Sequence, residues 1–336
     1  MPQVKTTFGF HSTAEEVVKG IDLSEIRVIA TGGSSGIGIE TARTLALIGT
    51  AAVITLGRSK RTKSLTNFFW LSRTGCPSFR AEVTLAVRNV EAGNIVAANI
   101  KETTSNPKVA VAHLDLADLA SVREFVGSWR GPLHILINNA GIMALPELVR
   151  TGEGYEMQFA TNFLGHFALT VGLHRFLATA NGARVVSLSS SANMIAPVIF
   201  DDLHFNFLPY EPFVAYGQSK TANVLFAVEA TRRWMDDGIF VNAVNPGAIA
   251  TNLQKHTGGL KTPPERRKTI QQGAATSVLV AVSPLLSGIG GRYFEDCNEA
   301  STVSQRPSDF GGGVAPYALN PDNAARLWAI AQTLIS

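Results

Sequence analysis

The chain has 336 residues, of which 46% are hydrophobic and 16% charged, and its formal net charge is +3. This composition excludes an intrinsically disordered chain, and so small a net charge gives no reason to expect a nucleic-acid partner. The length accommodates one large α/β domain or two small ones.

The first twenty residues are polar and mixed in charge, so they do not predict a secretory signal peptide. The most apolar late stretch, 274–289, is broken by Ser277, Ser283 and Pro284 and is too short to span a bilayer. Cys76 and Cys297 stand in unrelated contexts and match neither a disulfide framework nor a metal-binding spacing. We therefore expect a soluble cytoplasmic protein without a membrane span or a bound metal.

Hydrophobic periodicity predicts strands that alternate with helices along the chain. The predicted strands cover 27–30, 109–114, 133–137, 183–188 and 239–244. The predicted helices cover 39–48, 117–129, 155–177 and 213–235. This alternation favours an α/β fold, a Rossmann-type doubly wound parallel sheet with helices on both faces, built as a single domain.

A glycine-rich turn lies between the first predicted strand and the helix that follows it. The turn reads Thr31-Gly32-Gly33-Ser34-Ser35-Gly36-Ile37-Gly38. In this setting glycines let the backbone approach a pyrophosphate, whose charge is favoured by the positive end of the helix. The position between strand and helix favours this interpretation over an ordinary tight turn. The expected cofactor contacts here are Gly32, Ser34, Ser35, Gly36, Ile37 and Gly38.

Tyr216 and Lys220 stand at positions i and i+4 of a predicted helix and therefore share one face. A unit charge about 4 Å away, at an effective dielectric of about 20, contributes roughly 4 kcal/mol. We therefore expect the Lys220 ammonium to bring the pKa of the Tyr216 phenol from about 10 toward neutrality, as suits a general acid or base. Alone, such a pair is more often part of an ordinary surface helix, but together with the glycine-rich turn it favours a catalytic site.

Further polar motifs follow the predicted strands in chain order. They are Asp115, Asn138-Asn139-Ala140-Gly141, Asn162 in Asn162-Phe163-Leu164-Gly165-His166-Phe167, Ser190, and Pro246-Gly247. Together with the turn and the Tyr–Lys pair, this pattern resembles the short-chain dehydrogenase/reductase family over nearly the whole chain. The run Asn-Asn-Ala-Gly-Ile-Met and the long segment from Ser190 to Tyr216 most resemble the retinol-dehydrogenase-like branch.

The resemblance implies a role for each motif residue. Ser190 would orient the substrate oxygen, with Ser189 and Ser191 as alternatives, and Tyr216 would transfer the proton. Lys220 would tune Tyr216 and bind the nicotinamide ribose. Asn162 would help a water reach Lys220, and its alternative role is a hydrogen bond within the core. The implied cofactor contacts are Asp115, Leu116, Asn139, Tyr216, Lys220, Pro246, Gly247, Ile249 and Thr251. For Asp115 the alternative role is a helix N-cap.

Two similar segments, 51–56 and 81–86, compete for the second strand. Because an α/β unit needs only one of them, about thirty residues near 50–80 look inserted, and they depart from the family pattern. The segment is basic and contains Phe68-Phe69-Trp70. A retained intron or mistaken gene model is the favoured interpretation. A tolerated surface loop and a basic arm for membranes or partners are the alternatives.

The cofactor preference depends on the residue that follows the second strand. Arg88 follows the segment 83–87 and Arg58 follows 52–56, and neither candidate strand is followed closely by an acidic residue. An arginine accommodates the 2′-phosphate of NADP, whereas an acidic residue holds the ribose hydroxyl of NAD. We expect NADP(H) to be favoured over NAD(H). Arg88 is the preferred contact because a helix is predicted at 90–100, and a solvated arginine is the alternative.

The expected organisation is an N-terminal extension at 1–25 and a catalytic domain at 26–336. Loops at 195–212 and 251–264 are expected to close over the ligand. The apolar residues expected to border the pocket are Met143, Ala144, Ile195, Pro197, Val198, Ile199, Phe200, Phe205, Phe207, Leu208 and Leu253.

The sequence therefore predicts an NADP(H)-dependent enzyme that interconverts a small apolar alcohol and its carbonyl, with a homodimer as a possible assembly. An alternative from another class is a cofactor-binding protein without turnover, either a sensor or scaffold or a product disabled by the segment 50–80. A lyase or epimerase on the same fold is also open, because a fold does not fix a reaction.

Overall fold

One mixed sheet forms the centre of the computed structural model, which describes residues 2–48, 80–309 and 311–336. Within these residues the strand order is β3-β2-β1-β4-β5-β6-β7-β8. The strands are β1 (Arg27–Thr31), β2 (Glu82–Val87), β3 (Val109–His113), β4 (Ile135–Asn138), β5 (Ala183–Leu188), β6 (Ile239–Asn245), β7 (Tyr293–Glu295) and β8 (Asn298–Glu299). Neighbouring strands are parallel except for the antiparallel pair β7–β8. The predicted Rossmann-type α/β fold is confirmed.

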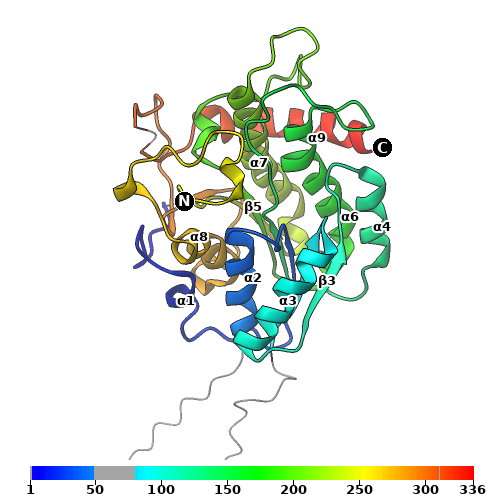
Figure 1. Cartoon of the computed structure of the whole chain (residues 1–336), viewed down its shortest axis with the longest axis vertical. Coiled ribbons are helices and arrows are strands. Elements are labelled where there is room, and N and C mark those ends of the chain that lie inside the picture. The colour runs from blue at the N-terminus through cyan, green and yellow to red at the C-terminus, as the bar shows by residue number, and fades with distance from the viewer. Residues whose placement is uncertain (1, 49–79, 310) are drawn as a thin grey trace, which may run out of the picture.

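Helices cover both faces of this sheet (Figure 1). They are α1 (Ala14–Val17), α2 (Ile37–Leu47), α3 (Val90–Thr104), α4 (Leu119–Ser128), α5 (Met157–Phe159), α6 (Gly165–Thr179), α7 (Pro212–Trp234), α8 (Ile270–Val282) and α9 (Pro321–Ile335). Helices α1, α2 and α8 pack on one another, as do α7 with α9 and α4 with α6. Two buried hydrophobic clusters, one on each face, result from this layering.

The second strand is the downstream candidate. β2 pairs with β1 through Val28 and Val83, and α3 follows it directly. This confirms the preference for 83–87. The upstream segment 52–56, Arg58 and the aromatic trio at 68–70 lie outside the described residues, as does the predicted insertion apart from Arg80.

The predicted helix at 155–177 is not one continuous α-helix, so this prediction is wrong in part. A π-helical segment, η2 (Ala160–Leu164), separates α5 from α6, and its i→i+5 hydrogen-bond pattern includes the bond from Gly165 N to Ala160 O. A Cβ at Gly165 would lie 2.1 Å from Leu116 O, so only glycine lets this turn approach the loop after β3. Apolar periodicity does not distinguish a π-segment from an α-helix.

Helix α8 and strands β7 and β8 were not predicted. Every residue of α8 from Gly273 to Val282 is buried, so the helix lacks the polar face that would mark its period in the sequence. β7 has only three residues and β8 two. These elements extend the sheet beyond β6 and, as shown below, bring Glu295 to the cleft.

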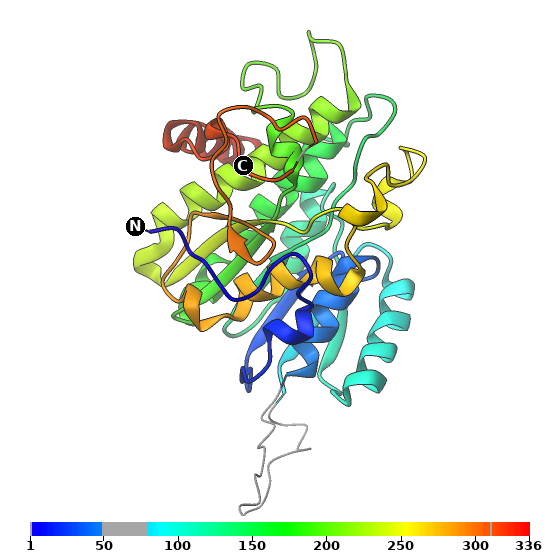
Figure 2. The same ribbon diagram turned by 90° about the vertical axis from the view of Figure 1, so that its left-hand side faces the viewer.

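The N-terminal segment follows the edge of the sheet and passes α8 (Figure 2). Val4 N donates to Glu299 Oε2 at 2.8 Å, and Asn298 Nδ2 donates to Phe8 O at 2.9 Å. Helix α1 then packs on α8. These contacts tie the expected extension to the sheet.

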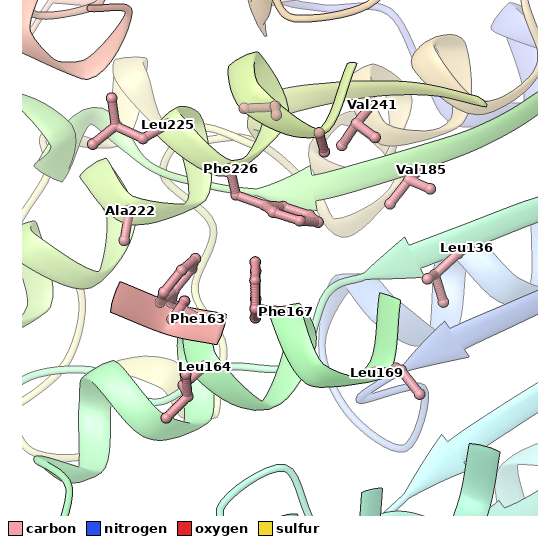
Figure 3. Packing of buried hydrophobic residues seen from close by; sticks show 14 of the residues in the cluster. Leu136, Phe163, Leu164, Phe167, Leu169, Val185, Ala222, Leu225, Phe226 and Val241 are labelled. Carbon is pink, nitrogen blue, oxygen red and sulfur yellow. The ribbon is translucent and has the colours of Figure 1, made fainter. Parts of the chain in front are cut away.

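Aromatic side chains fix α6 against α7 (Figure 3). Phe163 and Phe167 are buried, and the Phe167 ring lies 5.9 Å from Phe226 of α7 and 4.9 Å from Trp328 of α9. Buried edge-to-face pairs of this kind add to the energy of area burial. Because α7 also carries Tyr216, this packing fixes the helix that supplies the catalytic candidates.

Candidate active site

A cleft of about 1160 Å³ opens at the carboxyl ends of the parallel strands. Most of the predicted site residues line it: Gly32, Ser34, Ser35, Gly36, Ile37, Arg88, Asp115, Leu116, Asn139, Ser190, Tyr216, Lys220, Pro246, Gly247, Ile249 and Thr251. Gly38 and Asn162 do not line it and lie behind its wall. This is the edge where a doubly wound sheet binds its ligand.

The glycine-rich turn has the shape that a pyrophosphate requires. A Cβ at Gly32 would lie 2.8 Å from Ala140 Cα, and Gly32 and Gly36 both have positive φ, 66° and 58°. A Cβ at Gly38 would lie 2.5 Å from Gly32 O, so Gly38 closes the turn from behind rather than facing the cleft. Helix α2 begins without a side-chain cap at Gly36. Its free N–H groups therefore suit an anion, and the turn fits a dinucleotide.

Arg88 and Asp115 line the cleft where β2 and β3 end. Arg88 is exposed and directly follows β2. Asp115 Oδ1 accepts a hydrogen bond from Ala117 N at 3.0 Å. The N-cap of α4 is Asp118, so the N-cap role considered for Asp115 is wrong. A second carboxylate oxygen of Asp115 is left for another donor.

Tyr216 and Lys220 project from the first turns of α7, which starts with Pro212 after the capping residue Glu211. Lys220 Nζ lies 5.6 Å from the centroid of the Tyr216 ring and donates to Leu188 O at 2.9 Å. Burial and the i, i+4 spacing thus hold the ammonium beside the phenol, as the sequence predicted.

Ser190 is the serine that acts on the phenol, because its side chain lies close enough to lower the pKa of Tyr216. Ser189 Oγ instead donates to Lys220 O at 2.8 Å, a contact within the core. The Ser190 hydroxyl also accepts from Ala192 N at 3.2 Å and so caps the short helix that follows β5. This bond orients the Ser190 hydroxyl at the carboxyl end of β5.

The pKa of Tyr216 differs from the expected one. Burial raises the pKa of Tyr216 to about 12, although the Ser190 side chain acts in the opposite direction. Burial lowers the pKa of Lys220 to about 7. The expectation that Lys220 brings Tyr216 toward neutrality is therefore wrong for the protein alone, because desolvation disfavours both charged forms. At neutral pH the phenol is protonated and can act as a proton donor.

Asn162 lies in the π-helical segment and is fully buried. Its Oδ1 accepts from Ile142 N at 2.8 Å, and its Nδ2 donates to Ile142 O and to Ser219 Oγ, both at 2.9 Å. A Cβ at Gly141 would lie 3.2 Å from Asn162 Oδ1 and 3.6 Å from Lys220 Nζ, so both atoms border the same position. Asn162 thus joins the loop after β4 to the turn of α7 that holds Lys220.

Most of the apolar residues predicted to border the pocket do not line the cleft, so that prediction is largely wrong. Met143 and Leu253 line the cleft, whereas Ala144, Ile195, Pro197, Val198, Ile199, Phe200, Phe205, Phe207 and Leu208 do not. Val198 and Phe205 are core residues, and the Phe207 side chain is 90% exposed. The loop at 195–212 turns back on itself, because the Asp202 carboxylate accepts hydrogen bonds from the backbone N–H groups of residues 206–208.

Residues from distant parts of the chain complete the cleft instead. They include Phe10 and His11 of the N-terminal segment, Phe213 of α7, Leu260, Arg266, Glu295 and Asp309. Sequence reasoning missed them, because no local motif marks the approach of the N-terminal segment or the end of β7. Among the residues described, no cluster of three or more His, Cys, Asp or Glu side chains could hold a metal. None of the helices in the described part of the chain is long and apolar enough to cross a membrane.

Comparison with known proteins agrees with this geometry. Residues 78–259 match the family model described as short chain dehydrogenase. The chain is 47% identical to a probable oxidoreductase of Streptomyces antibioticus, over 92% of this chain and 97% of that protein. It is 34% identical to retinol dehydrogenase 12 of Homo sapiens, over 92% of this chain and 85% of that protein.

Solved structures give the same result. An uncharacterized protein from Mycobacterium paratuberculosis matches with a TM-score of 0.68 and 30% identity over 97% of both chains. A short-chain dehydrogenase from Sphingobium yanoikuyae in complex with NADPH matches with a TM-score of 0.54 over 76% of this chain and 83% of that one, and at 21% identity it supports the fold alone. The chain therefore belongs to the short-chain dehydrogenase/reductase family, within its retinol-dehydrogenase-like branch.

Proposed function

We propose that this oxidoreductase uses NADP(H) to interconvert an apolar alcohol and its carbonyl through Ser190, Tyr216 and Lys220. The observation that carries the proposal is that these three side chains meet in the same cleft as the glycine-rich turn. Family membership supports an enzyme that acts on CH–OH groups. The cofactor preference, the substrate class and the residue roles are the parts that experiment has to test.

The choice of NADP(H) rests on Arg88. Its guanidinium follows β2 at the adenosine end of the cleft, where it would bind a 2′-phosphate. The uncapped start of α2 would hold the pyrophosphate, and Lys220 the nicotinamide ribose. When bound, the nicotinamide supplies or accepts a hydride.

Proton transfer is assigned to the protein side chains. In the reduction direction the Tyr216 hydroxyl donates its proton to the carbonyl oxygen, and in oxidation the phenolate accepts it. Ser190 orients that oxygen and stabilises the charge that develops on it. The Lys220 ammonium stabilises the phenolate left on Tyr216. Asn162, held by Ile142 and Ser219, keeps the surroundings of Lys220 polar so that a water can approach it.

An apolar substrate is supported by the residues at the substrate end. Ile142, Met143, Phe213, Leu253 and Leu260 line the cleft there. Apolar walls with few polar groups are typical of sites for small apolar ligands.

The test is an assay of the purified protein with NADPH or NADH and a panel of apolar aldehydes and ketones. The proposal predicts cofactor oxidation with several of them and faster turnover with NADPH. Tight NADPH binding without turnover across the panel would instead favour the cofactor-binding protein. Sedimentation of the same sample tests the predicted homodimer.

A further inference from the structure

His166 occupies a buried position between Asn162 and the glycine-rich turn, and none of the proposed steps uses it. The side chain lies in the first turn of α6, one turn after Asn162, and the residue is only 3% exposed. Both ring nitrogens have partners: Nδ1 lies 3.0 Å from Asn162 O, and Nε2 lies 2.8 Å from Thr31 Oγ1.

These contacts fix one tautomer of the imidazole. A carbonyl oxygen can only accept, so Nδ1 carries the hydrogen and donates it to Asn162 O. Nε2 is then an acceptor, and the Thr31 hydroxyl donates to it. Thr31 Oγ1 in turn accepts from Asn139 N at 2.9 Å and from Ala140 N at 3.0 Å. Burial lowers the pKa of His166 to about 4, so the ring is neutral throughout the physiological range.

The resulting chain of hydrogen bonds joins the two halves of the cleft. It runs from the loop after β4 through Thr31, at the start of the glycine-rich turn, to His166 and on to the backbone of Asn162. Asn162 lies in the π-helical turn, whose i→i+5 pattern includes the bond from Gly165 N to Ala160 O, and the His166 ring donates to the Asn162 carbonyl. The Asn162 amide then reaches Ile142 and Ser219, and Ser219 Oγ donates to Tyr216 O at 2.7 Å.

We propose that His166 is a positioning residue. Its Nδ1–H holds the backbone of Asn162, and Asn162 thereby keeps the turn that carries Tyr216 and Lys220 in a fixed position relative to the glycine-rich turn. His166 touches neither the substrate nor the cofactor in this role. Its effect on turnover rests on the proposed function, whereas its effect on the loop after β4 does not. A displacement of about 1 Å in a catalytic group can cost on the order of 100-fold in rate.

Two conservative substitutions separate the two hydrogen bonds. His166→Asn places an amide where Nδ1 stood and keeps a donor for Asn162 O. His166→Gln places an amide where Nε2 stood and keeps a partner for Thr31 only. The proposal predicts that His166→Gln lowers kcat at least tenfold, whereas His166→Asn recovers most of the activity. KM and the dissociation constant of NADPH should stay within about threefold in both variants, as expected when positioning rather than binding is lost.

A purely structural role predicts the opposite order. Asn is the smaller side chain and leaves the larger cavity, so it would be the more damaging variant if packing alone mattered. His174→Asn and His174→Gln are the matched controls, because His174 lies on the same helix but contacts Asp237 at 2.9 Å and the Trp234 ring, neither of which lines the cleft. Both control variants should keep wild-type activity. Melting temperatures of the wild type, the two His166 variants and the two His174 variants show whether activity merely follows stability.

Amide hydrogen exchange makes the test independent of turnover. The peptide containing Ile142, whose N–H is bonded to Asn162 Oδ1, should exchange faster in His166→Gln than in His166→Asn or in either control. Equal exchange in the two His166 variants, or a kcat in His166→Gln at or above that of His166→Asn, would overturn the proposal. If the wild type turns over no carbonyl, the proposed function fails and exchange alone decides the role of His166.

Discussion

At the scale of single residues, burial decides the chemistry of the Tyr216–Lys220 pair more strongly than their mutual distance does. The sequence places an ammonium next to a phenol, and at an exposed site that would lower the pKa of the phenol. In the folded chain both groups are desolvated, which raises the pKa of Tyr216 to about 12 and lowers that of Lys220 to about 7. The protein alone is therefore prepared for proton donation by Tyr216.

Replacement of Tyr216 by Phe tests that donation. We expect turnover to fall by about 10²–10⁴-fold, the usual contribution of a general acid, while NADPH binding, followed by fluorescence, stays largely intact. The phenylalanine keeps the packing of α7 and removes only the hydroxyl close to Ser190. Turnover within about tenfold of the wild type would remove Tyr216 from the acid role.

Lys220 gives a prediction about stability and pH. Its folded-state pKa of about 7 lies below the ordinary value of 10.5, so between these values the unfolded chain binds more protons at this site. The free energy of unfolding should therefore rise with pH above 7, by up to about 1.4 kcal/mol per pH unit from this group. Lys220→Met removes the titration and should flatten the rise between pH 7 and 9, measured by denaturant unfolding. Parallel curves for the two proteins would assign the rise to other groups.

Arg88 is expected to set the cofactor preference. Arg88→Ala should reduce the ratio of NADPH to NADH efficiency, because a charge-assisted phosphate contact is worth about 1.5–3 kcal/mol. The ratio of kcat/KM values for the two cofactors measures this loss, and NADH kinetics serve as the internal control. An unchanged ratio would mean that Arg88 is merely solvated, and Arg58 would be the next residue to replace.

At the scale of elements, the helix that carries Asn162 shows where periodicity is insufficient. Phe159, Phe163 and Phe167 repeat every four residues and predict a continuous helix, and all three are buried. The π-helical turn within that helix lies directly before Gly165, where the backbone closely approaches the carbonyl of Leu116. A local pattern cannot contain that contact.

Gly165→Ala tests this close approach. The added Cβ would lie 2.1 Å from Leu116 O, and relief requires a backbone shift at the start of α6. We expect a loss of stability of about 1–3 kcal/mol, the usual cost of overpacking, measured as a lower free energy of unfolding. Gly127→Ala is the matched control, because a Cβ there has no neighbour within 4 Å and Gly127 lies in the exposed last turn of α4. That variant should be neutral or slightly more stable, since alanine favours helix over glycine. Equal losses in the two variants would contradict the close-approach argument.

At the scale of the whole molecule, the two ends that flank residues 49–79 lie side by side. Asn106 Nδ2 donates to both Ala46 O and Ala81 O at 2.9 Å, so the end of α2 and the start of β2 share one buried donor. Arg80 also donates to the carbonyls of Leu47 and Thr104. Arg80 fell inside the predicted insertion 50–80, but these bonds make it an anchor of the sheet.

Deletion of residues 50–79, which joins Gly49 to Arg80, should therefore leave a protein at least as stable and at least as active. The flanking residues already meet at Asn106, glycine is a common stop after a helix, and a shorter loop costs less closure entropy. Thermal unfolding and NADPH-dependent turnover of the full and shortened chains provide the comparison. A shortened protein that fails to fold, or loses NADPH binding, would make the segment integral and would exclude the retained-intron interpretation.

The sequence by itself determined the features that depend on short-range chemistry. The glycine-rich turn needs positive φ at Gly32 and Gly36, and the Tyr–Lys pair needs only helical spacing. Strand β5 needs a short buried run. All three features were predicted. The competing second strands were resolved toward 83–87 because a helix had to follow directly. Local sterics and the period of the backbone suffice for such features.

Only the tertiary structure decided the features that depend on contacts distant in sequence. Desolvation reversed the expected direction of the Tyr216 pKa shift. The approach of α6 to Leu116 accompanies the π-helical turn at Asn162. The walls of the cleft came from Phe10, Glu295 and other residues far apart along the chain rather than from the loop at 195–208. Burial and close approach are properties of the packed molecule, and no single segment of the sequence contains them.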